Sequence, residues 1–81
     1  MYEVVLSARA RAQTESLPED GKRALDEAVE VLGGDPWSGE HYQHGHSDEW
    51  RSLAFGTWGV VVYLIHESRR AVLLLDVTWA G

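Results

Sequence analysis

Two short turns in the second half of this chain constrain its fold more than any other feature. Residues 56–57 and 67–69 separate three segments that are rich in β-branched and aromatic residues. Strands joined by turns this short must be antiparallel neighbours in one sheet. We therefore expect three adjacent strands at residues 50–55, 58–66 and 70–79.

The first half of the chain predicts one more strand and two helices. Residues 2–6 are typical of a strand, and Ser7 is placed to cap a helix over residues 8–15. Ser16 and Glu19 have the spacing of a capping box, ahead of a stretch with helical apolar periodicity that ends at two glycines. The order β-α-α-β-β-β predicts a single α+β domain over residues 1–81, with two helices packed on a four-stranded, mostly antiparallel sheet.

The balance of charge argues against a nucleic-acid binder. Thirteen acidic residues against seven Lys and Arg give a net charge of −6 with His neutral. Nucleic-acid affinity depends largely on a basic surface that neutralises phosphates. The chain has no cysteine and no apolar run long enough to cross a membrane. We expect a protein of the reducing cytoplasm with no cofactor and no membrane partner.

The central strands carry apolar residues on both faces. Residues 60–65 and 71–75 do not alternate apolar with polar, although two helices can cover only one face of a sheet. Either loop aromatics such as Trp37 and Tyr42 cover the second face, or a partner does. For a partner surface we expect contributions from Trp58, Trp79 and Leu74, and a second copy of the chain is one candidate partner.

A histidine loop is the densest group of titratable side chains. His41, His44 and His46 lie in an aperiodic segment that also holds Glu40 and Asp48. Histidine can serve as both general base and general acid near neutral pH. Two alternatives remain open, a metal site with an irregular ligand spacing and an ordinary polar loop.

Arginines supply the remaining candidate site residues. Arg51 could pair with a phosphate, or with the neighbouring Asp48 or Glu49. His66, Arg69 and Arg70 form a small basic corner at a turn, which could also contact phosphate or could be a solvated hairpin end. Asp76 is a single acid within an apolar strand, and its role stays open.

Short motifs occur in a fixed order along nearly the whole chain. They are Tyr2-Glu3-Val4-Val5, Leu17-Pro18, Asp35-Pro36, Trp50-Arg51, Gly56-Thr57-Trp58 and Val61-Val62-Tyr63. This ordered set resembles the RelE/ParE toxin superfamily of bacterial type II toxin–antitoxin systems. The resemblance implies one of two actions. RelE-like members cut messenger RNA in the ribosomal A site, whereas ParE-like members poison DNA gyrase, and an antitoxin wraps and inhibits both kinds.

Residues on which RelE-like nucleases depend are missing here. Gly59 and Val60 follow Trp58 where the family carries a catalytic arginine, and residues 78–81 contain no basic stretch. RNA cleavage needs a base, an acid and a cation at the scissile phosphate. If the chain is an enzyme, we expect an endoribonuclease (mRNA interferase) built on the histidine loop and Arg51, with the basic corner on RNA.

We therefore expect the toxin component of a type II toxin–antitoxin pair, with an antitoxin as its partner. A ribosome-dependent messenger RNase would also bind the ribosome and mRNA. The alternative is a non-catalytic ParE-like or degenerate homologue that acts through protein–protein binding, which the acidic charge and the missing arginines favour.

Overall fold

The structure, a computed structural model, describes residues 1–43, 45 and 47–81. Two proposed site residues, His44 and His46, lie outside the described residues. The elements are β1 (Glu3–Leu6), α1 (Ala8–Glu15), α2 (Glu19–Gly34), the 3-10 turn η1 (Pro36–Ser38), β2 (Glu40–His41), β3 (Trp50–Phe55), β4 (Gly59–His66), the 3-10 turn η2 (Glu67–Arg69) and β5 (Ala71–Trp79).

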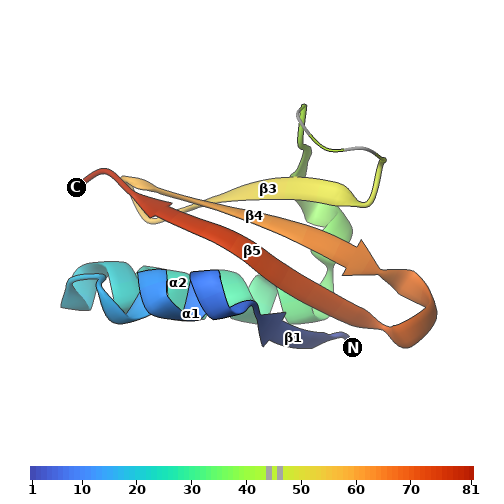
Figure 1. The fold of residues 1–81 in the computed structure, drawn as a ribbon, viewed down its shortest axis with the longest axis horizontal. Helices are drawn as coiled ribbons and strands as arrows, with labels where there is room; N and C mark the ends of the chain where they lie inside the picture. Colours follow the sequence, from blue (N-terminus) through green and yellow to red (C-terminus); the bar gives the residue numbers. More distant parts are fainter. Residues whose placement is uncertain (44, 46) are drawn as a thin grey trace.

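The strands form one sheet in the order β1-β5-β4-β3-β2. Only the β1–β5 pair is parallel, because the chain returns to the sheet across two helices, while the other pairs are antiparallel. Both helices lie on the same side of the sheet (Figure 1). The predicted α+β class is confirmed. The sheet has five strands rather than four, because Glu40 and His41 pair with β3, and two residues are too few to give a periodic signal.

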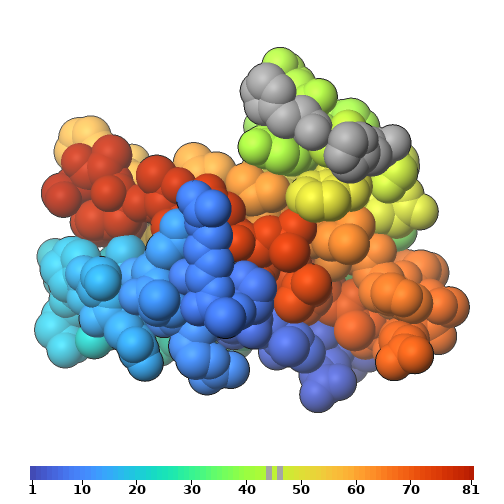
Figure 2. Space-filling view, viewed as in Figure 1, coloured from blue at the N-terminus to red at the C-terminus, as the bar shows by residue number. Residues whose placement is uncertain are grey.

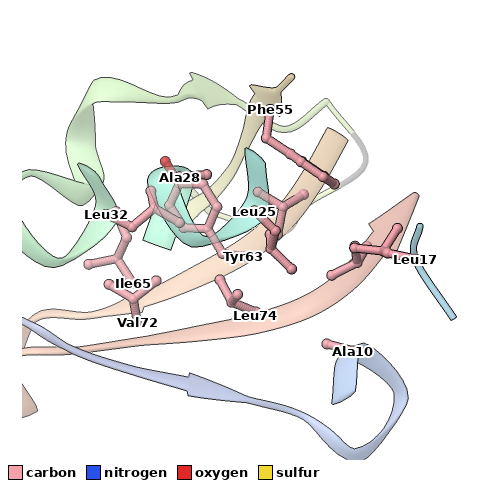
Figure 3. Close-up of a cluster of buried hydrophobic side chains, with 12 residues drawn as sticks. Ala10, Leu17, Leu25, Ala28, Leu32, Phe55, Tyr63, Ile65, Val72 and Leu74 are labelled. Atoms are coloured by element: carbon pink, nitrogen blue, oxygen red, sulfur yellow. The ribbon is translucent and has the colours of Figure 1, made fainter. Parts of the chain in front are cut away.

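The core lies between the helices and the sheet (Figure 3). From α2 it takes Leu25, Ala28 and Leu32, and from the strands mainly Tyr63 and Leu74. The Tyr63 ring is fully buried, and its hydroxyl donates to the carbonyl of Pro36 at 2.6 Å. Burial raises the pKa of this phenol, so Tyr63 stays a neutral donor that ties η1 to the sheet.

The two helix starts show one correct and one wrong prediction. Ser7 caps α1, since its Oγ accepts from the N–H of Ala10 at 3.1 Å. The capping box does not form, because Ser16 ends α1 and Pro18 occupies the N-cap of α2 without a side-chain bond. Leu17, in the short connection between the helices, is buried in the core.

Helix α1 takes the place of a strand along the second half of β5. The strand β1 pairs with β5 only as far as Leu74. Beyond it, Gln13 accepts from the backbone N–H of Val77 and donates to Asp76 Oδ1, both at 2.7 Å. Figure 2 shows the blue residues of α1 lying against the red residues of β5. A side-chain amide therefore satisfies backbone that would otherwise be a free sheet edge.

Candidate functional site

The proposed catalytic residues His41 and Arg51 lie opposite each other on neighbouring strands. They are register partners in the β2–β3 pair, and the His41 side chain is exposed. The sheet thus brings together two residues that are ten positions apart in the sequence. The other two histidines of this proposed site lie outside the described residues, so the full set has no geometry here.

The Arg51 guanidinium is held by the segments on both sides of β2. Its Nε and Nη2 donate to the carbonyl and carboxylate of Asp48 at 2.9 and 2.8 Å, and Nη1 donates to the carbonyl of Gly39 at 3.1 Å. The group also lies over the Trp37 ring, 5.1 Å from its centroid. The side chain is only 16% exposed. In this conformation Arg51 fixes the loop to the sheet and has little surface left for a phosphate.

Glu67 organises the corner that holds the other proposed phosphate contacts. Its carboxylate accepts from the Tyr2 hydroxyl at 2.8 Å, from Trp37 Nε1 at 3.0 Å and from Arg70 Nη1 at 3.1 Å. The bond from Tyr2, helped by those from Trp37 and Arg70, lowers the pKa of Glu67. The same bond to the carboxylate raises the pKa of Tyr2. This acid therefore remains charged and neutralises much of the basic corner.

The three members of the basic corner have different surroundings. The Arg70 guanidinium stacks on the Tyr2 ring at 4.4 Å and forms an ion pair with Glu67. His66 Nδ1 lies 3.3 Å from Ser68 Oγ, and the Arg69 side chain is exposed. Sequence reasoning missed Tyr2, Trp37 and Glu67 here, because no local pattern shows that the chain start, η1 and η2 meet.

The proposed partner residues do not share one surface. Trp58 is 58% exposed at the β3–β4 turn, whereas Trp79 is partly buried against Phe55, with ring centroids 5.7 Å apart. Leu74 is fully buried on the helix-covered face, so its prediction as a partner contact is wrong. The reason is local register. Leu74 pairs with Tyr63, and its neighbour Leu75 is an extra residue in β5 without a partner in β4.

The sheet face opposite the helices is called the open face here. Strand residues that alternate with those of the helix-covered core point to this face, and most of them are apolar. The larger apolar ones are Val5, Trp50, Val60, Val62, Leu64 and Leu73. Cover is partial. Tyr42 lines a hollow of about 380 Å3 over Val62, whereas Val5 and Val60 remain 42% and 45% exposed. Trp37 packs elsewhere, against Arg51 on the helix side.

Asp76 is an acid on the open face. Thr78 Oγ1 of the same strand donates to its Oδ2 at 3.3 Å, and its other partners come from α1. Asp76 accepts from Gln13 Nε2 at 2.7 Å and forms an ion pair with Arg9 Nε at 3.1 Å. Within residues 1–43, 45 and 47–81, no three histidine or carboxylate side chains converge as metal ligands. No helix in the described part of the chain is long and apolar enough to cross a membrane. The described side chains thus combine an apolar sheet face with three arginines, Arg9, Arg51 and Arg70, that already have acidic partners.

Comparison with solved structures places the fold. A chain of the intact E. coli RelBE toxin–antitoxin complex superposes with a TM-score of 0.82 at 14% identity, covering 100% of this chain and 99% of that one. The isolated E. coli RelE toxin gives 0.83 at 13% identity, with 100% and 86% covered. The toxin–antitoxin complex RelBE2 from Mycobacterium tuberculosis gives 0.77 at 24% identity, with 98% of each chain covered.

By sequence, the chain matches no family model and no curated protein. The structural matches nevertheless extend over the whole length of the chain. The resemblance to RelE toxins that the ordered motifs predicted is confirmed for the fold. A fold alone does not assign an activity, which has to be argued from the surface.

Proposed function

We propose that this chain is the toxin component of a type II toxin–antitoxin pair and that it acts in the cytoplasm. The observation that carries the proposal is the full-length match to chains of RelBE toxin–antitoxin complexes. A second observation agrees with it. An apolar sheet face that two helices leave open favours a protein that is covered by a partner for part of its life.

The open face is the surface through which we expect the protein to work. Val5 and Val60 expose apolar surface at two ends of it, and Leu64 and Leu73 lie between them as register partners. Burying such residues in an interface is favourable by roughly 25 cal/mol per Å2 of apolar surface. An antitoxin on this face would shield the surface, and its removal would expose it to a target.

Protein binding is the mode of action that the described side chains favour over RNA cleavage. Arg51 is held by Asp48, and Arg70 by Glu67. Freeing either arginine for a phosphate would break these contacts. The net charge of −6 also opposes approach to RNA. The action we propose is therefore closer to that of a non-catalytic toxin than to that of a messenger RNase.

A ribosome-dependent cleavage assay tests the mode of action. Purified protein is added to ribosomes that translate a defined message, and cuts are mapped by primer extension. We expect no cuts from protein whose folding is verified by circular dichroism. Discrete A-site cuts would overturn the non-catalytic mode, and substitution of His41, His44 and His46 by alanine would then locate the chemistry. Growth arrest on induced expression tests the toxin assignment separately.

A further inference from the structure

One end of β3 is a free sheet edge. The N–H of Ile65 donates to the carbonyl of Glu49, which therefore faces β4. The carbonyl of Trp50 instead accepts from the N–H of Tyr42 and faces away from β4. Since backbone groups alternate along an antiparallel strand, Ser52 and Ala54 also direct theirs away from β4.

Ala54 is the position where the backbone groups that face away from β4 no longer have a partner strand. Ser52 pairs with Glu40 of β2, but β2 has only two residues and stops there. The Ala54 N–H and carbonyl have no hydrogen-bond partner within the described ranges, and the residue is exposed.

An apolar groove of about 210 Å3 borders this edge. One wall is formed by Leu53 and Phe55, and the other by Ala24, Ala28 and Val31 of α2. Val31 is 49% exposed. Among the large aliphatic side chains described, only that of Met1 is more exposed. An unpaired donor and acceptor beside an apolar groove is the arrangement that accepts an extended peptide as an added strand.

Charge at the groove selects the kind of peptide. Glu27 lines the same groove and is exposed, and none of the ion pairs formed by the described residues involves it. Helix α2 carries five acids against two bases. Two copies of the chain pairing edge to edge would bring two acidic helices together, which disfavours a homodimer. A basic segment would instead gain from Glu27.

We propose that the Ala54 edge and its groove bind a short, extended, basic segment of a partner protein. The segment residue opposite Ala54 exchanges two backbone hydrogen bonds with it. Its two neighbours then point toward the groove, one an aliphatic side chain against Val31 and the other a lysine or arginine that reaches Glu27. The groove lies on the helix side of the sheet, away from the open face, and the proposal does not depend on the toxin assignment.

Pentapeptide probes test the proposal directly. Two peptides carry threonine at positions one, three and five, with valine and lysine at positions two and four in either order. Titrated into 15N-labelled protein, at least one of them should move the amide signals of residues 24–31 and 53–56. Matched peptides with glutamate in place of lysine should bind about fivefold more weakly. Absence of shifts up to the solubility limit, shifts elsewhere, or equal binding of the glutamate peptides would overturn the proposal.

Two substitutions locate the contact. Ala54→Pro removes the outward N–H but no bond to β4, so it should weaken binding about tenfold in a folded protein. Glu27→Gln should weaken binding of the lysine peptide only, whereas Glu30→Gln, which lines a different groove between α2 and β1, should leave it unchanged. Because Glu27 is exposed, its variant tests the site even if the proline variant does not fold. Unchanged lysine-peptide binding by Glu27→Gln contradicts the proposed contact.

Discussion

At the scale of single residues, two polar side chains hold the chain's irregular segments in place. Glu67 accepts from Tyr2 at the start of the chain, from Trp37 in η1 and from Arg70 at the last turn. Arg51 likewise holds the segments before and after β2, through Gly39 and Asp48. Trp37 contacts both, since its ring lies under Arg51 and its Nε1 donates to Glu67. Loops that have no apolar periodicity are thus fixed by charge and aromatic contacts.

The lowered pKa of Glu67 gives stability a defined pH dependence. Because its folded-state pKa lies below the unfolded value of about 4.3, the ionised group stabilises the fold fully above that pH, and the stabilisation is lost as pH falls. Urea unfolding at pH 7 should show Glu67→Gln to be less stable than the natural protein, and the difference should shrink below about pH 4.3. Glu3→Gln, at an exposed strand position, is the control. A difference between Glu67→Gln and the natural protein that grows on acidification would contradict this account.

We expect Arg51 to stabilise the fold through the several hydrogen bonds that its planar guanidinium makes at once. Lysine keeps the charge but cannot reach Asp48 and Gly39 at once. Arg51→Lys should lower the free energy of unfolding by about 1–2 kcal/mol. Arg69→Lys, at an exposed arginine, should change it by less than about 0.5 kcal/mol. Equal effects of the two substitutions in urea unfolding would show that the buried contacts of Arg51 contribute nothing.

The candidate site was predictable only in its residue types. Sequence offered Asp48, Glu49 or a phosphate as partners of Arg51, and the structure has Asp48 as the partner. The further bond to Gly39 and the stacking on Trp37 could not be predicted, because they depend on where an aperiodic loop folds back. The same holds for Tyr2 and Glu67, which are 65 positions apart in the sequence.

At the scale of elements, local signals gave most of the boundaries. The helix α1 and the strand β3 have the predicted bounds, because a capping serine and tight turns mark their ends. Two features escaped prediction. The two-residue strand β2 has no periodicity of its own, and the extra residue in β5 shifts which leucines face the core.

Gln13 shows how a helix can complete a sheet. Its amide oxygen accepts from the N–H of Val77, a buried residue whose N–H would otherwise have no partner. Gln13→Ala should therefore lower the free energy of unfolding by about 1–3 kcal/mol. Arg11→Ala, at an exposed position of the same helix, should have an effect within about 0.5 kcal/mol. Thermal or urea unfolding measures both variants, and a loss for Gln13→Ala no larger than for Arg11→Ala would contradict this role.

At the scale of the whole molecule, the chain combines the RelE fold with an acidic surface. The superpositions on the three solved structures have TM-scores of 0.77 to 0.83 and cover nearly the whole chain. The chain itself has a net charge of −6. A fold can keep its core while the charges on its surface change, because the core depends on apolar volume and the surface does not. The apolar open face is then the surface through which we propose that this molecule acts on another protein.

Growth of a bacterial host after induced expression tests this account most directly. The natural protein should arrest growth. Val60→Glu, which places a charge on the 45%-exposed valine of the open face, should not. Ala12→Glu, which adds the same charge to an exposed position of α1, should arrest growth as the natural protein does. Soluble protein is quantified in each culture. Growth unaffected by the natural protein, or arrest by Val60→Glu at equal soluble level, would contradict the proposed toxin and its working surface.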